Sequence, residues 1–181
     1  MKELFNRIIV WGADKEIHNI QFETLVQIDF LLEELREVIK EFIAGNTDAA
    51  VGEICDLIVY SVNALALLKS EPRPNNDIVI MNDSHHISII RKINIEIKNI
   101  IDSCWFNSGV PASSSYKDLI DVCCKCMRVL GYSPEIALEE TIKKIESRRG
   151  AMNPITGKWE KFIGQHDIYT PDYSKARINN D

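Results

Sequence analysis

Two pairs of carboxylates stand out in the sequence because the members of each pair are three residues apart. Glu34 and Glu37 form the first pair, and Glu53 and Asp56 form the second. Residues three apart on an α-helix share one face, so each pair can present its two carboxylates together. Clustered carboxylate oxygens suit Mg²⁺ or Mn²⁺. The spacing therefore predicts a divalent-cation site, provided that the two pairs face each other.

The segments that carry the pairs have the pattern of a helical hairpin. Apolar residues at intervals of three and four predict a helix over residues 19–44. Gly45 is a suitable residue to end it, and Thr47 or Asp48 can cap a second helix that reaches about residue 70. Helices joined by so short a link lie antiparallel, and this brings the two carboxylate pairs face to face.

The second helix of this hairpin is apolar nearly all round, which is typical of a buried helix, yet it carries Glu53 and Asp56. Ionised carboxylates are costly to bury unless something compensates their charge. Neither acidic stripe contains Lys or Arg, so a bound metal ion is the expected compensation. Di-iron bundles add a Glu-x-x-His motif, which neither helix has. The alternative is a structural bundle whose acids face solvent, since ExxE alone is a common pattern.

The remaining chain predicts further helices and a loop. Helical periodicity covers residues 4–11, and residues 71–83 form a loop rich in Pro, Asn and Asp. Later helices are expected from Ser84 to the break at Gly109, from residues 113–115 to Gly131, and from Pro134, capped by Ser133, to about residue 149. The fold class predicted from these patterns is all-α.

The acidic motif resembles the signature of a known family. The run EELRE at residues 33–37, followed by EICD at residues 53–56, is similar to the EExxE…ExxD pattern of the MazG-like all-α nucleoside triphosphate pyrophosphohydrolases. Dimeric dUTPases and phosphoribosyl-ATP pyrophosphohydrolases are relatives in that group. The likeness covers residues 27–68 and departs at Phe30, where many relatives carry Lys. The C-terminal segment resembles, more weakly, the tail of bacteriophage-type members.

The resemblance implies a fold and an activity. The expected fold is a MazG-like helical bundle, with a pyrophosphohydrolase domain over residues 1–150 and a tail over residues 151–181 that belongs to it. The expected reaction is Mg²⁺-dependent hydrolysis of nucleoside triphosphates, with deoxynucleotides preferred, to a monophosphate and pyrophosphate; Mn²⁺ could replace Mg²⁺. The expected assembly is a homodimer or homotetramer.

The resemblance, together with helix spacing and local charge, assigns roles to residues. The four carboxylates would be metal ligands, and Glu34 or Glu37 would also act catalytically by orienting or deprotonating a water. Substrate contacts are expected from side chains on the hairpin and in the basic segment 143–161, namely Gln27, Tyr60, Asn63, Arg148, Lys158 and Lys161. The basic segment has six Lys or Arg against two Glu. Beyond Gly150 we expect irregular structure that closes over the site while the helical core packs without it.

Composition excludes several other classes of protein. The chain has 181 residues, 45% of them hydrophobic and 27% charged, which fits one globular domain. A net charge of −6 argues against a nucleic-acid coat protein. The five cysteines are odd in number and lie in apolar helical patterns, so buried thiols are expected. With no apolar run long enough to span a bilayer and no leader pattern, we expect a cytoplasmic protein. A non-catalytic nucleotide-binding or assembly protein remains the alternative function.

Overall fold

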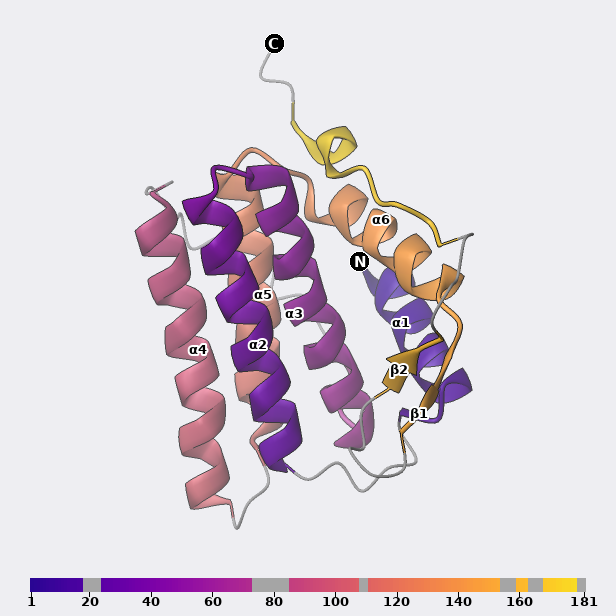
Figure 1. Cartoon of the computed structure of the whole chain (residues 1–181). Helices are drawn as coiled ribbons and strands as arrows, with labels where there is room; N and C mark the ends of the chain where they lie inside the picture. Colours follow the sequence, from indigo (N-terminus) through magenta and orange to yellow (C-terminus); the bar gives the residue numbers. More distant parts are fainter. Residues whose placement is uncertain (18–23, 73–84, 108–110, 154–158, 163–167, 179–181) are drawn as a thin grey trace.

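The computed structural model describes residues 1–17, 24–72, 85–107, 111–153, 159–162 and 168–178. Helices dominate this part of the chain, so the all-α prediction is confirmed (Figure 1). The helices are α1 (Lys2–Asp14), α2 (Thr24–Ile43), α3 (Thr47–Leu67), α4 (His86–Phe106), α5 (Ser113–Val129) and α6 (Pro134–Ser147). Ser133 caps α6 as predicted, since its hydroxyl accepts a hydrogen bond from the N–H of Ile136 at 3.4 Å.

The central element is α3, which contacts α1, α2, α5 and α6. In Figure 1, α2 and α4 lie on one side of it and α1 and α6 on the other. Many side chains of α3 are fully buried, among them Val51, Ile54, Leu57, Ile58, Val62 and Leu65. By length and composition α3 could cross a membrane, but the rest of the chain buries 72% of its most apolar window. The central helix of a bundle has the same composition.

The link between α2 and α3 is the tight turn that the sequence predicts. Gly45 has a φ of 76°, which strains most other residues. Its N–H donates to the carbonyl of Phe42 at 3.2 Å, and that of Asn46 donates to the carbonyl of Glu41 at 2.9 Å. These two bonds form a Schellman motif. The N-cap position of α3 falls on Asn46, one residue before the predicted Thr47.

The segment after α6 is more ordered than predicted. Two short antiparallel strands, β1 (Gly150–Met152) and β2 (Trp159–Lys161), pair with Gly150 opposite Lys161. Farther on, η2 (Tyr173–Ala176) is a turn of 3₁₀ helix. The expectation of irregular structure beyond Gly150 is therefore wrong for these residues. Strands of three residues are too short to show an alternating pattern in the sequence.

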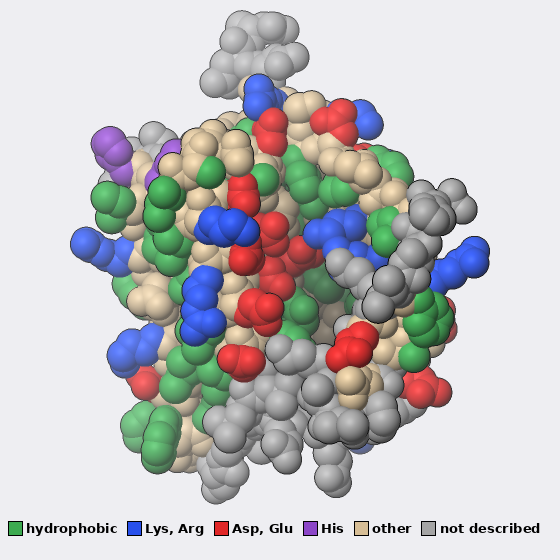
Figure 2. Space-filling view, viewed as in Figure 1, with side chains coloured by type: hydrophobic (Ala, Val, Ile, Leu, Met, Phe, Trp, Pro, Cys, Tyr) green, Lys and Arg blue, Asp and Glu red, His purple; other side chains and the backbone are tan. Residues whose placement is uncertain are grey.

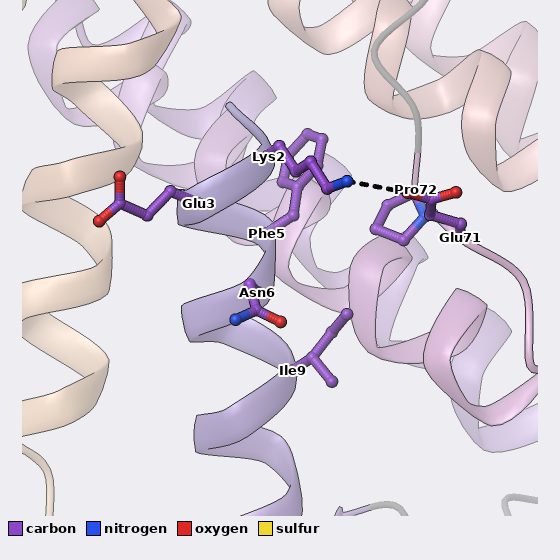
Figure 3. Close-up of a pocket in the computed structure, with 7 residues that line it drawn as sticks. All are labelled: Lys2, Glu3, Phe5, Asn6, Ile9, Glu71 and Pro72. Carbon is purple, nitrogen blue, oxygen red and sulfur yellow. Dashed lines mark ion pairs between the residues drawn. The ribbon is translucent and has the colours of Figure 1, made fainter.

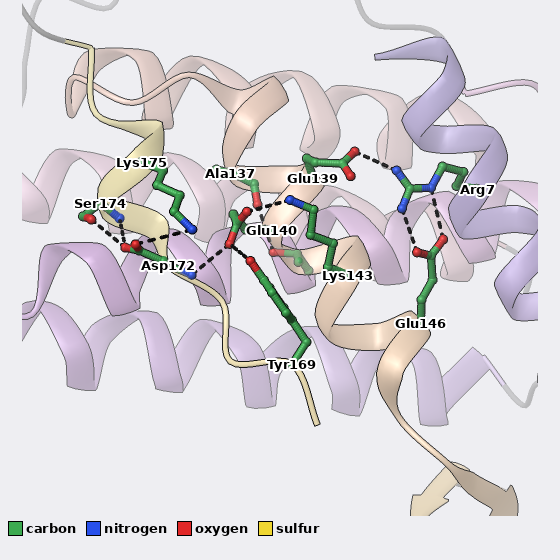
Figure 4. A network of polar contacts seen from close by, with 11 residues as sticks. Arg7, Ala137, Glu139, Glu140, Lys143, Glu146, Tyr169, Asp172, Ser174 and Lys175 are labelled. Carbon is green, nitrogen blue, oxygen red and sulfur yellow. Dashed lines mark hydrogen bonds and ion pairs between the residues drawn. The ribbon is translucent and has the colours of Figure 1, made fainter. Parts of the chain in front are cut away.

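A buried carboxylate on α6 binds the incoming tail (Figure 4). Glu140 is only 3% exposed. It accepts hydrogen bonds from the Tyr169 hydroxyl, from the Asp172 N–H at 3.0 Å and from Lys143 at 2.9 Å. Burial by itself would raise the pKa of Glu140, but these donors outweigh it and lower the pKa to about 2. The tail thus supplies two of the donors that make this buried charge tolerable.

Beyond that contact the tail enters the core. The Tyr173 side chain is 9% exposed, and its hydroxyl lies 3.0 Å from the Thr141 hydroxyl on α6. Ala176 is fully buried, and Arg177 donates two hydrogen bonds to Asp48 on α3 at 3.0 and 2.7 Å. The tail is therefore packed into the helical core, and the expectation that the core does not need it stays a prediction. These contacts come from isolated residues, which leave no periodic signal in the sequence.

Because Tyr173 lies so close to Gly52, a substitution that normally stabilises a helix is expected to destabilise this protein. A methyl group added at Gly52 would lie 2.5 Å from Cε2 of the Tyr173 ring. Replacing glycine by alanine inside a helix normally stabilises a protein by about 1 kcal/mol. Here we expect Gly52→Ala to lower the free energy of unfolding by about 1–3 kcal/mol, because the buried ring has to move. Thermal and urea unfolding measure the change.

The control is the same substitution in a chain with a smaller residue at the tail position. In a Tyr173→Leu background, Gly52→Ala should be neutral or stabilising, since the ring is gone. A stabilising Gly52→Ala in the wild-type chain would show that the tail does not pack on α3 as described.

Candidate metal centre

Three of the four predicted ligands lie together between α2 and α3. One carboxylate oxygen from each of Glu34, Glu53 and Asp56 lies within 4.8 Å of the others. All three residues are half-buried. In Figure 2, acidic side chains gather down the middle of the face formed by these helices, with Lys and Arg side chains on either side. The tight hairpin therefore brings the two acidic stripes together as the sequence predicts for these three residues.

The fourth predicted ligand, Glu37, lies at the edge of this cluster. Its carboxylate accepts a hydrogen bond from Lys40, one turn later on α2, at 2.7 Å. The Glu37 side chain is 42% exposed, so its charge is stabilised by both solvent and Lys40. That charge still contributes to raising the pKa of Glu53. Glu37 is close enough to act on the cluster but is not one of the three converging carboxylates.

Without a cation, the cluster keeps a proton at a pH at which isolated carboxylates are ionised. Burial, then the charges of Asp56 and Glu53, raise the pKa of Glu34 to about 8. A hydrogen bond from the protonated Glu34 to Glu53 adds to this shift. Burial and the charge of Asp56 also raise the pKa of Glu53. The repulsion expected from the sequence is therefore present, and the acids relieve part of it by sharing a proton.

A lysine from a distant helix relieves another part. Lys144 on α6 donates a hydrogen bond to Asp56 at 2.8 Å, and the two side chains are 18% and 14% exposed. Its charge opposes the upward pKa shifts of both Glu34 and Glu53. Lys144 lies outside the two hairpin helices, so the spacing of the acids alone does not predict this partner. The available signal was the basic end of α6, which alone does not show which face packs on α3.

The donor set fits a hard divalent cation. The converging ligands are carboxylate oxygens, and the cluster in the described part of the chain includes no His or Cys. The prediction of buried thiols is confirmed for four of the five cysteines, and Cys104 is free but only half-buried. The four are Cys55, Cys123, Cys124 and Cys126. Burial raises the pKa of Cys124 and of Cys126 to about 12, so neither offers a thiolate. Oxygen ligands that remain half-open to solvent suit Mg²⁺ or Mn²⁺.

An aromatic pair lies beside the acids. The ring of Tyr60 on α3 stacks on Phe30 of α2, with ring centroids 5.0 Å apart and planes inclined by 14°. Burial, then the charges of Glu34 and Asp56, raise the pKa of Tyr60, and the charge of Arg148 opposes this. Tyr60, predicted to contact substrate, therefore interacts with both the acidic cluster and Arg148, another predicted substrate contact.

The other predicted substrate contacts are less closely tied to the cluster. Asn63 is 5% exposed, and its amide donates a hydrogen bond to the carbonyl of Val59 at 3.0 Å. Gln27 lies in α2 and Lys161 in β2, but their side chains fall outside the described part of the structure, as does all of Lys158. A substrate role for these residues stays a prediction.

The tail packs against the same stretch of α3 that carries the acids. Gly52, against which Tyr173 packs, immediately precedes Glu53. Burial raises the pKa of Tyr173, and the nearby acids Asp56 and Glu53 raise it further. Residues 168–178 thus help to position the part of α3 that presents two of the three ligands.

A separate hollow of about 550 Å³ lies between the start of α1 and the end of α3 (Figure 3). Its lining consists of Lys2, Glu3, Phe5, Asn6, Ile9, Glu71 and Pro72. Lys2 and Glu71 form an ion pair across it at 3.6 Å. None of the predicted site residues lines this hollow, so it is distinct from the acidic cluster.

Comparison of the chain with protein families, with curated proteins and with solved structures finds no match. The residues and their geometry therefore carry the functional argument.

Removing Lys144 should uncover the repulsion among the acids. We expect Lys144→Met to lower the free energy of unfolding by about 1–3 kcal/mol in EDTA, because Asp56 loses its partner while half-buried. Saturating Mg²⁺ should restore most of this loss, since a bound cation replaces the lysine charge. The measurement is the melting temperature with and without Mg²⁺.

The control for this experiment is Lys143→Met on the same helix. Its partner is Glu140, outside the acidic cluster. The loss in Lys143→Met should not respond to Mg²⁺. An equal Mg²⁺ effect in the two variants would argue against a cation site at Asp56.

The raised pKa of Glu34 predicts the pH dependence of stability. An unfolded chain has an ordinary Glu pKa of 4.5, whereas the folded chain keeps this proton up to about pH 8. Since the folded state binds more protons in that window, the metal-free protein should lose stability as the pH rises from about 5 to about 8. Melting temperatures measured in EDTA across this range test the prediction. Glu34→Gln should flatten the slope, and a slope that the variant leaves unchanged would assign the effect to other groups.

Proposed function

We propose that this chain is a divalent-metal-dependent nucleotide pyrophosphohydrolase of the MazG-like type, acting on nucleoside triphosphates, with deoxynucleotides as the preferred substrates. The observation that carries the proposal is the convergence of Glu34, Glu53 and Asp56 within 4.8 Å across an antiparallel helical hairpin. The motif resemblance covers the same hairpin, and the oxygen-only donor set is the kind that Mg²⁺ or Mn²⁺ takes at phosphate-processing sites.

In this proposal, Glu34, Glu53 and Asp56 would hold Mg²⁺, or Mn²⁺ in its place. When bound, the ion would supply positive charge to the phosphate oxygens and lower the pKa of a water molecule. Glu34 lies on the α2 side of the cluster and Glu37 at its edge. Either carboxylate can orient the attacking water and accept its proton. The water oxygen bonds to the α-phosphorus, and the bond between that phosphorus and the oxygen bridging to the β-phosphate breaks. The products are a nucleoside monophosphate and pyrophosphate.

Basic and aromatic side chains beside the cluster suit the rest of a nucleotide. Lys144 forms an ion pair with Asp56, and the positive charge of Arg148 opposes the rise in the pKa of Tyr60. Cations near an acidic metal site compensate the remaining charge of a triphosphate. The stacked pair of Phe30 and Tyr60 offers an aromatic surface next to the metal ligands. We assign Tyr60 to base or sugar contact and the two basic residues to phosphate.

A second candidate, a non-catalytic nucleotide-binding or assembly protein, is favoured by one observation. Lys144 already pairs with Asp56 and Lys40 with Glu37, so part of the acidic charge is compensated by the protein itself. A binding protein could keep such a site without turnover. Release of pyrophosphate separates the two candidates.

We expect purified protein to release pyrophosphate from nucleoside triphosphates in Mg²⁺ and to be inactive in EDTA. Asp56→Asn should lower the turnover by at least about 100-fold, because it removes one charged metal ligand while keeping the side-chain shape. A screen of ribo- and deoxynucleoside triphosphates with pyrophosphate detection gives both activity and preference.

The matched control is Asp118→Asn, an exposed aspartate on α5. It should keep wild-type turnover. Full activity of Asp56→Asn in saturating Mg²⁺, or of the wild-type protein in EDTA, would contradict the proposed site. Binding without turnover by every substrate tested would favour the non-catalytic alternative.

A further inference from the structure

The outer face of α4 carries large apolar side chains that are exposed in the described part of the chain. The inner face packs through Ile89, Ile93, Ile97 and Ile100, all of them buried. On the outer face Ile87 is 71% exposed, Ile95 47%, Trp105 84% and Phe106 87%. Nine large apolar side chains are exposed in the described part of the chain, and these four lie on one helix. Such concentration is typical of a docking surface.

The spacing of these residues forms a continuous stripe. With 3.6 residues per turn, Ile87, Arg91, Asn94, Lys98, Asp102 and Trp105 follow one side of α4, and Ile95 and Phe106 flank it. From Ile87 to Phe106 the stripe is about 30 Å long. Figure 1 shows α4 at the edge of the bundle, where it packs on α2 and α5 and has no other labelled helix beyond it.

The order of charges along the stripe is suited to a second copy of the same helix. We propose that two copies of this chain associate through α4, antiparallel and related by a two-fold axis that passes between the positions of Glu96 and Ile97. Residues at equal distances on either side of such an axis face each other. Arg91 then faces the partner's Asp102, and Ile87 faces the partner's Phe106.

The two-fold axis produces each of these contacts twice. Lys98 pairs with Asp102 within one helix at 2.5 Å, so Asp102 would lie between its own Lys98 and the partner's Arg91. Near the axis, Ile95 lies against the aliphatic part of the partner's Lys98. The resulting contact has an aromatic and aliphatic cluster at each end and paired charges between them, as in stable interfaces.

Other arrangements of this surface are less favourable. Two parallel α4 helices would place Arg91, Lys98 and Asp102 each against the same charge, which destabilises a helix pair. A lipid surface would have to accept the charges of Arg91, Lys98 and Asp102 in the middle of the stripe. The antiparallel pair is the arrangement that both buries the apolar ends and joins opposite charges.

The test measures self-association by sedimentation velocity and light scattering over a range of micromolar concentrations. The wild-type chain should be dimeric. Arg91→Asp and Asp102→Arg should each weaken the dimer by about 10-fold or more, because each brings two like charges together at both contacts. Trp105→Ser should weaken it as well, and Ile136→Ser, at an exposed apolar residue on α6, should not.

Mixing the two charge variants tests the register itself. A chain with Arg91→Asp and a chain with Asp102→Arg have complementary stripes, so the mixture should form a heterodimer of near wild-type affinity. Circular dichroism and thermal melts confirm that each variant is folded. A monomeric wild-type chain, a dimer unaffected by all three α4 variants, or a mixture that does not recover would overturn the proposal.

Discussion

The main constraint on this structure is the repulsion among three carboxylates that a helical hairpin holds together, because the rest of the protein has to compensate their charges. Glu34, Glu53 and Asp56 are half-buried and lie within 4.8 Å of one another, so their charges cannot all remain uncompensated. The protein offers three ways to compensate them. A proton stays on Glu34 up to about pH 8, Lys144 reaches in from α6, and a divalent cation can bind the oxygens directly. The first two describe the metal-free chain, and the third is the basis of the proposed activity.

The remainder of the fold keeps these carboxylates from moving apart. The Schellman turn at Gly45 sets how α2 and α3 face each other, and the apolar contacts around α3 hold it at the centre of the bundle. The tail then packs on α3 beside the acids, with Tyr173 against Gly52 and Arg177 on Asp48. Because Glu140 binds the same tail to α6, the helix that carries Lys144 and the helix that carries Asp56 are joined by more than their ion pair. Rigid support of this kind is what a metal or phosphate site requires.

The features that could be predicted from the sequence are those determined within one helix or one turn. Apolar periodicity gave the hairpin, the identity of its turn residue gave the reversal at Gly45, and the spacing of three placed Glu53 and Asp56 on one face. The missed features are contacts between elements far apart in the chain. Lys144 reaches Asp56 only because of the way α6 packs on α3, and Tyr173 enters the core as a single residue without a repeating pattern. Glu37 stays outside the converging carboxylates, whereas Glu34 is one of them, and Glu37 binds Lys40 one turn away on the same helix. The spacing of the acids alone does not predict this ion pair.

The central claim is that a divalent cation binds between α2 and α3. Anomalous X-ray scattering from crystals of the protein grown with Mn²⁺ tests it most directly, because Mn²⁺ can be located independently of water or Mg²⁺. The account predicts an anomalous peak among the oxygens of Glu34, Glu53 and Asp56, with the Lys144 ammonium moved away from Asp56. An ion pair between Lys144 and Asp56 that persists at saturating Mn²⁺, with no peak among the three carboxylates, would contradict it.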